Sequence, residues 1–217
     1  MKIKKCSHID GFYFTLIQGQ SRYYYGHSDT EEFYEIPDWL KNGGYQGSVI
    51  QFFDLETGQK FIPFTKERNV LYGNPIFCDG YIYFLRGDFQ QQTLTLFQYL
   101  PDKVQNEIYK QDLDKFDLYN LQLIGTPVHI VSQDNRNICC YYPEPFEYTK
   151  ELNESLMCME NDRLYFNAWI EEGVENDRIT DRYQYYDKLI VKDFQGNILS
   201  QEVGCLSQFP DGSWWIV

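Results

Sequence analysis

A hairpin motif that recurs along the chain is the feature that most restricts the possible folds. In each copy a short apolar segment meets an Asp-Gly or Asn-Asp pair, and a segment rich in aromatic residues follows. Four copies are clear and a fifth is degraded: residues 8–14, 77–84, 159–166 and 209–216, and residues 130–139. Asp, Asn and Gly tolerate the positive φ angles of two-residue hairpin turns, and aromatic residues suit a pleated, half-buried strand. The motif therefore predicts antiparallel β-hairpins.

Additional strand pairs lie between these copies, at residues 48–60, 93–103 and 189–199. A unit of four strands and about 40–50 residues is typical of a propeller blade. Because a four-stranded sheet cannot bury both faces alone, such units stack face to face. The sequence predicts an all-β fold, a β-propeller-like array of about four to five four-stranded antiparallel units. No Gly/Ser-rich or Pro-rich linker divides the chain, so residues 1–217 are expected to form a single β domain.

Two other arrangements explain the same hairpins, namely a β-sandwich and an open stack of β-meanders. A helical bundle is excluded because alanine, the best helix former, occurs once, at Ala168. One or two short helices are expected near residues 30–42. There Thr30 could cap a first helix, and Pro37 could begin a second that stops at Gly43.

The order of strands and turns resembles that of irregular β-propeller-like repeat proteins of bacteria, many of which have no assigned function. The resemblance covers most of the chain but rests on repeat order alone. There is no WD dipeptide and no kelch double glycine, and the last unit stops after two strands. In a closed ring, strands from the N-terminus would have to complete that last unit.

The charge of the chain restricts its partners. With 19 basic and 32 acidic side chains the net charge is −13, which disfavours nucleic acid and anionic membranes and favours a basic protein or a cation. The alternative is that the charge serves solubility alone. The acidity concentrates in residues 151–217, which carry 5 basic and 13 acidic side chains. No run approaches the ~18 apolar residues of a membrane span. The six cysteines show no zinc-type spacing, so we expect reduced thiols and no metal site. We also expect no cofactor and a cytoplasmic location.

Catalytic motifs are missing from the sequence. It contains three histidines but no G-x-S-x-G elbow, no H-E-x-x-H, no P-loop and no G-x-G-x-x-G. Two of the 32 carboxylates could still meet in the fold, as glycoside hydrolysis requires. The sequence therefore favours a protein that is not an enzyme without deciding the question.

The first candidate binding segment is the unusual stretch at residues 22–32. Tyrosines supply rigid contact area at low entropic cost, and a polar tip follows them. The candidate binding residues here are Tyr23, Tyr24, Tyr25 and His27. The alternative is a β-strand and a helix start whose tyrosines pack in the ordinary way.

The second candidate is an acidic segment at residues 171–181, expected to be an exposed loop between two strands. Its candidate residues are carboxylates: Glu171, Glu172, Glu175, Asp177 and Asp181. The segment lacks the ligand order of an EF-hand, so contact with a basic partner is favoured over calcium binding. The alternative is a loop that is simply solvated.

These observations lead to one functional hypothesis and two rivals. The leading hypothesis is a non-enzymatic binding protein that presents aromatic and acidic loops to a protein partner, which could be basic. The first rival is a carbohydrate-active enzyme or sugar-binding protein with its site on the propeller axis. The second is a structural subunit of a larger assembly, which predicts a large exposed apolar patch.

Overall fold

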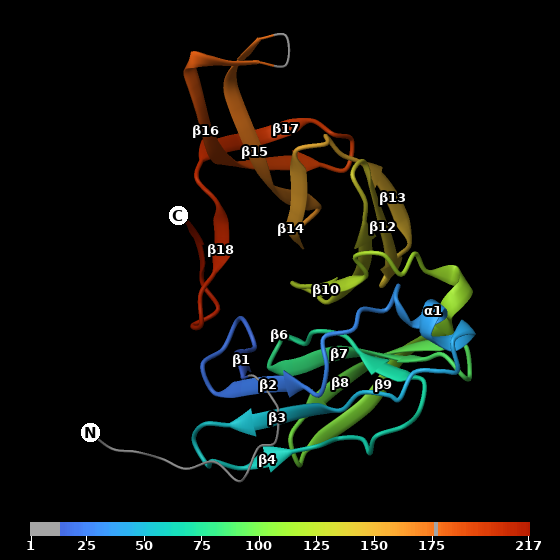
Figure 1. The fold of residues 1–217 in the computed structure, drawn as a ribbon. Helices are drawn as coiled ribbons and strands as arrows, with labels where there is room; N and C mark the ends of the chain where they lie inside the picture. The colour runs from blue at the N-terminus through green and yellow to red at the C-terminus, as the bar shows by residue number, and fades with distance from the viewer. Residues whose placement is uncertain (1–13, 176–177) are drawn as a thin grey trace.

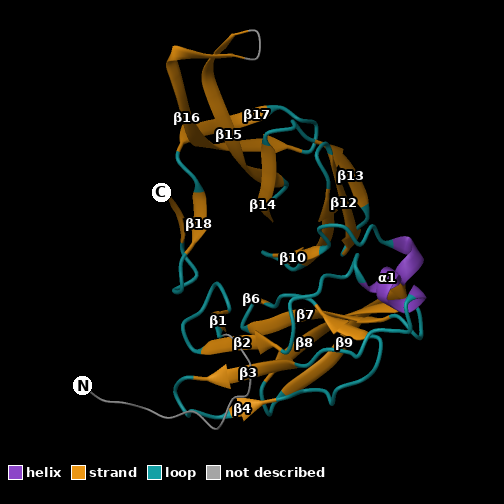
Figure 2. Ribbon diagram, viewed as in Figure 1, coloured by secondary structure: helices purple, strands orange, loops and turns teal. Residues whose placement is uncertain are grey.

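The computed structural model describes residues 14–175 and 178–217, and antiparallel β-sheet dominates it (Figures 1 and 2). Strands make up 55% of the described residues and helices 4%, which confirms the all-β prediction. The first sheet is a meander in chain order: β1 (Thr15–Leu16), β2 (Tyr23–His27), β3 (Ile50–Asp54) and β4 (Lys60–Phe61). The second sheet has five strands: β5 (Val70–Tyr72), β6 (Ile76–Cys78), β7 (Tyr81–Asp88), β8 (Thr93–Leu100) and β9 (Val104–Asp112). In it β5 and β6 both pair with β7, at opposite ends of that strand.

Two more four-stranded meanders and a short hairpin complete the chain. The third sheet comprises β10 (Gln122–Ile124), β11 (His129–Gln133), β12 (Asn137–Tyr142) and β13 (Phe146–Thr149). The fourth comprises β14 (Glu154–Glu160), β15 (Arg163–Glu175), β16 (Arg178–Asp193) and β17 (Ile198–Val203). The C-terminal hairpin consists of β18 (Leu206–Gln208) and β19 (Trp214–Ile216). The prediction of repeated four-stranded antiparallel units is confirmed, and within residues 14–175 and 178–217 no sheet closes on itself.

The turn residues explain where the hairpins form. Asp79 and Gly80, between β6 and β7, have φ angles of 50° and 82°. Asn161 and Asp162, between β14 and β15, have φ angles of 48° and 61°. These left-handed values match the twist of the flanking strands, as expected of such two-residue turns. The copy predicted at residues 8–14 lies outside the described residues apart from its last position.

Helix is confined to α1 (Ile36–Lys41) and one 3-10 turn, η1 (Leu113–Lys115), in the described part of the chain. Helix α1 confirms a short helix near residues 30–42. The helix expected to start at Thr30 is absent, because residues 28–32 have no helical structure and α1 is preceded by Glu35. Pro37 lies in the first turn, where its missing N–H costs nothing.

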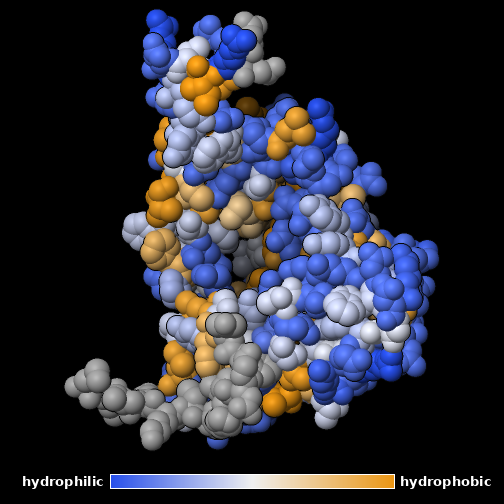
Figure 3. Space-filling model, in the orientation of Figure 1, coloured by the Kyte–Doolittle hydropathy of each residue, from blue (hydrophilic) through white to orange (hydrophobic). Residues whose placement is uncertain are grey.

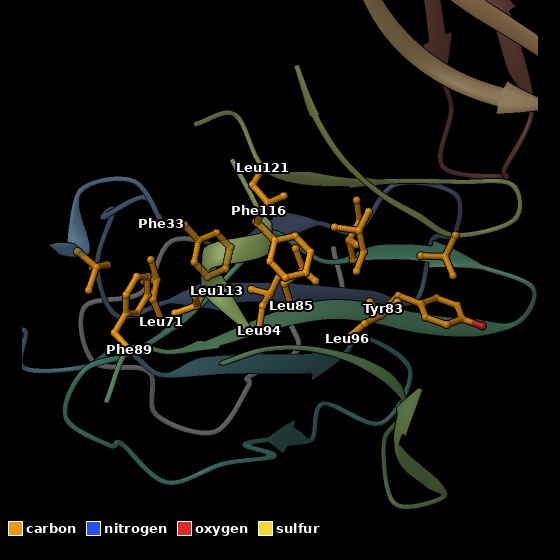
Figure 4. Close-up of a cluster of buried hydrophobic side chains, with 14 of the residues drawn as sticks. Phe33, Leu71, Tyr83, Leu85, Phe89, Leu94, Leu96, Leu113, Phe116 and Leu121 are labelled. Carbon is orange, nitrogen blue, oxygen red and sulfur yellow. The ribbon is translucent and has the colours of Figure 1, made fainter. Parts of the chain in front are cut away.

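Each sheet packs against the next one in the chain. Phe52 of the first sheet and Phe84 of the second belong to one buried cluster, and Leu85 and Ile130 join the second sheet to the third in another. Figure 4 shows this other cluster, with Leu85 among its labelled side chains. Further clusters join the third sheet to the fourth and the fourth to the C-terminal hairpin. The apolar core is therefore divided into layers between sheets, which accounts for most of the aromatic residues.

The C-terminal hairpin returns to the beginning of the described chain (Figure 1). A Cβ atom added to Gly19, in the turn between β1 and β2, would lie 3.1 Å from the carbonyl oxygen of Phe77 and 3.2 Å from Nε2 of Gln208. The first sheet, the second sheet and the hairpin thus meet at Gly19. Its φ of 87° also favours glycine there.

Candidate functional site

Strand β2 places the candidate tyrosines in different surroundings. Tyr23 is only 8% exposed and belongs to the core between the first two sheets, which fits the packing alternative for this residue. Tyr24 is half-buried and pairs with Phe53 in the sheet register. Tyr25 and His27 point to one side of the strand, as residues two apart do, and their rings lie 5.4 Å apart edge to face. Of the four binding residues predicted in this stretch, only Tyr25 and His27 line a cavity.

This cavity has a volume of about 250 Å³ and lies between β2, the segment at residues 29–33 and the end of β5. The hydroxyl of Tyr25 donates to Oδ1 of Asn74, 3.2 Å away, and both residues line the cavity. Asp29 lies in the wall and accepts a hydrogen bond from the hydroxyl of Tyr45. We call this space the first-sheet cavity.

His27 is a neutral imidazole at pH 7. Burial lowers its pKa from 6.5 to about 4, because the charged ring would lose its hydration. Its Nε2 is buried and has no hydrogen-bond partner among the described residues. His27 therefore presents an uncharged, polar nitrogen to its surroundings.

The lowered pKa of His27 predicts a pH dependence of stability. Between pH 6.5 and pH 4 the unfolded chain binds more protons than the folded protein, so the free energy of unfolding falls as the pH falls. When the pH falls from 7 to 4, the free energy of unfolding should fall by about 3 kcal/mol less in His27→Gln than in the wild type. Urea denaturation at both pH values measures the difference. An equal loss in the two proteins would contradict the lowered pKa of His27. The variant His129→Gln provides a comparison, because burial also lowers the pKa of His129.

A larger polar groove adjoins the first-sheet cavity and shares Glu32 and Asn74 with it. Its volume is about 660 Å³, and its floor includes two buried charged side chains. Glu154 forms an ion pair of 2.6 Å with Lys192, and Nζ of Lys150 donates to the carbonyl oxygen of Asn135 at 3.0 Å. These charges are therefore already paired or hydrogen-bonded within the protein.

A third cavity, of about 260 Å³, lies among β6, β10, β14 and the C-terminal hairpin, and this face of the molecule is hollowed (Figure 3). Its lining is mainly apolar with a few amides, and includes Phe77, Gln133, Met157 and Trp214. No Asp or Glu of the described residues lines it. This cavity thus lacks the carboxylate pair that glycoside hydrolysis would need.

The acidic segment is a strand ribbon and not the expected loop. Strands β15 and β16 continue their pairing as far as Glu175 and Arg178, with a bulge next to Gly173. Glu171 and Glu172 lie on β15, Glu175 ends it, and Asp181 lies on β16; Asp177 lies outside the described residues. Tyr, Ile and Val residues are interspersed among the charged residues of this segment, which is a signal for a strand. The many carboxylates favour a loop instead and so hide this signal.

We call residues 170–175 and 178–186 the arm. Its carboxylates are hydrogen-bonded across the ribbon: Oε1 of Glu171 accepts from the hydroxyl of Tyr183 at 2.6 Å. Glu172 accepts from Gln184 at 2.5 Å and from the hydroxyl of Tyr186 at 2.8 Å, and these bonds lower its pKa. The arm therefore holds the carboxylates of Glu171 and Glu172 in defined positions. It extends from the fourth sheet at the opposite end of the molecule from β2 (Figure 1).

An exposed aromatic stack lies at the base of the arm. The rings of Trp169 and Tyr185 are stacked 4.7 Å apart, although the two side chains are 45% and 60% exposed. Tyr183 lies next in the row, 6.2 Å from Tyr185. Nothing in the sequence alone marks these three residues as a cluster. Trp169 pairs with Asp187 in the register of β15 and β16, which places it two residues from Tyr185 across the ribbon, and only this register brings the rings together.

Comparisons with known proteins were made for the whole chain. No family model, curated protein or solved structure matches it.

In the described ranges no group of three His, Cys, Asp or Glu side chains could hold a metal ion. The five cysteines described there are free. None of the helices in this part of the chain is long and apolar enough to cross a membrane.

Proposed function

We propose that this protein is a non-enzymatic binding protein that docks a basic protein partner through its arm. The observation that carries the proposal is the exposed stack of Trp169 on Tyr185. Tryptophan and tyrosine are the residues that most often dominate binding energy at interfaces. In a protein without a partner, two large rings stacked in solvent would bury little of their apolar surface.

The pairing of the arm supports the same proposal. Strand β14 pairs with β15 only as far as Ala168, and β17 pairs with β16 only from Lys188 onward. Trp169 still bonds Asn153 through its backbone, and the carbonyl oxygen of Asp187 still accepts from the N–H of Gly204. From Ile170 and Tyr186 outward, the two strands pair only with each other in the described chain. An isolated two-stranded ribbon is marginally stable in water, and its free edges are natural docking sites. A partner that covers the arm would stabilise it.

Charge indicates the kind of partner. Residues 170–186 contain five acidic and two basic side chains. Fixed carboxylates beside an aromatic anchor match a surface rich in Lys and Arg, and such complementarity mainly speeds association. A basic protein is therefore favoured over an acidic one or a nucleic acid.

We further propose that the sheets form a propeller-like array that serves as the scaffold for the arm. Support comes from the packing of each sheet on the next and from the return of the C-terminal hairpin to Gly19. The resemblance in repeat order points the same way. The arm would then be a long hairpin that projects from one unit of the array.

A capture experiment tests the function. Tagged wild-type protein should retain a basic protein in stoichiometric amount from native lysate, and calorimetry should give its affinity. Trp169→Ala with Tyr185→Ala should weaken binding by more than about tenfold, because each exposed ring supplies anchoring area. Glu175→Gln with Asp181→Asn should slow association and reduce its salt dependence.

The matched control is a second exposed aromatic pair, Tyr34 and Tyr119, whose rings lie 5.4 Å apart beside the polar groove. Its double alanine variant should bind the partner as the wild type does. The proposal is wrong if no stoichiometric partner is retained, or if the arm variant and the control retain it equally.

A further inference from the structure

The first-sheet cavity is lined by acidic side chains without a matching base. Asp29, Glu31 and Glu32 contribute carboxylates, and no Lys or Arg of the described residues lies in the lining. Burial and the neighbouring charge of Glu35 raise the pKa of Glu32, as expected where negative charge is uncompensated. The cavity therefore has a negative potential that the described protein itself does not neutralise.

Three residues that line this cavity have a buried polar atom without a hydrogen-bond partner among the described residues. Oδ2 of Asp29 accepts a hydrogen bond from the hydroxyl of Tyr45, but Oδ1 of Asp29 has no partner. Nε2 of His27 and the hydroxyl of Tyr72 also have none. Buried polar atoms in folded proteins are nearly always hydrogen-bonded, so three such atoms in the residues of one cavity indicate a ligand that supplies missing bonds.

The walls also favour a particular shape of ligand. The ring of Tyr25 forms one side, and its hydroxyl is held by Asn74, so a flat cation can lie against an aromatic surface. The available acceptors come from separate residues and not from one point. At about 250 Å³ the cavity is smaller than most drug-sized sites and suits a group of side-chain size.

We propose that the first-sheet cavity binds an organic cation with a guanidinium head, of the size of an arginine side chain. A guanidinium offers five N–H donors in a planar fork, so it can donate to more than one acceptor at a time and stack on a ring. An ammonium presents a more compact charge that is more strongly hydrated. The inference does not depend on the proposed function, because the cavity lies in the first two sheets and the arm in the fourth.

Calorimetry at pH 7 with butylguanidinium as the probe tests the inference, with butylammonium and the uncharged butylurea for comparison. Wild-type protein should bind butylguanidinium saturably, butylammonium several times more weakly, and butylurea not at all. Asp29→Asn and Glu32→Gln should each weaken binding by about tenfold, since each removes a charged acceptor. Glu147→Gln, at an exposed carboxylate on β13, should change nothing.

Three outcomes would overturn the proposal: no saturable binding by the wild type, unchanged affinity in Glu32→Gln, or equal binding of butylurea. Equal affinity for butylammonium would overturn the choice of guanidinium. Glu32 is exposed, so its variant carries the test if Asp29→Asn unfolds after losing part of its contact with Tyr45. The arm variant should bind the probe normally, which separates this result from the test of the proposed function.

Discussion

Phe84→Ala is expected to lower the free energy of unfolding by about 3–5 kcal/mol. Phe84 has no exposed surface and lies at the centre of the cluster between the first two sheets. Its ring is stacked 5.5 Å from that of Phe97 and lies 5.6 Å from that of Phe52. Removing it leaves a cavity that rigid sheets on both sides cannot close. Urea denaturation followed by tryptophan fluorescence measures the change.

The control for this prediction is Tyr119→Ala, at a side chain that is 52% exposed. Its effect should stay within about 0.5 kcal/mol, as is usual for surface positions. A loss below about 1 kcal/mol in Phe84→Ala would mean that the first two sheets do not share a tightly packed core. Contact between these sheets also positions the first-sheet cavity, so the result bears on that site.

Lys192→Met should destabilise the protein by about 3–5 kcal/mol. Nζ of Lys192 lies 2.6 Å from Oε1 of Glu154, and the two side chains are 9% and 2% exposed. The pair joins β14 and β16 across β15. Without the lysine a carboxylate stays buried without its counter-charge, and this penalty exceeds the attraction that the pair itself contributes. Thermal and urea unfolding measure the effect.

The double variant Lys192→Met with Glu154→Met is the decisive comparison, because it removes both charges. It should recover most of the stability, since replacing a buried pair with apolar side chains is often neutral. Lys41→Met, which breaks an exposed pair with Asp38, should cost no more than about 1 kcal/mol. A double variant as unstable as Lys192→Met would show that packing, and not the unpaired charge, causes the loss.

The two proposed surfaces divide the protein by function. The arm offers exposed aromatic area and fixed carboxylates, which suit a macromolecular partner. The first-sheet cavity is small and partly open, and suits one charged group. Together they are consistent with the acidity of the chain, although each is tested by a different ligand.

The candidate site was only partly predictable. In the stretch at residues 22–32 the tyrosines are the visible signal, yet Tyr23 packs in the core while Asp29, Glu31 and Glu32 carry the charge of the cavity. In the acidic segment the sequence shows the carboxylates but predicts a loop, whereas the structure has paired strands. Trp169 and Tyr185 are 16 positions apart, so only the register of β15 and β16 brings their rings together.

Local sequence determined the hairpins, because turn geometry depends on the φ angles of two adjacent residues such as Asp79 and Gly80. It also determined the β class and the acidic last third. Tertiary structure decided which faces are buried and which polar groups meet. Tyr25 and Asn74 are 49 positions apart, and Lys192 and Glu154 are 38 apart. Such contacts depend on how separate sheets pack, and no local preference of the chain specifies that packing.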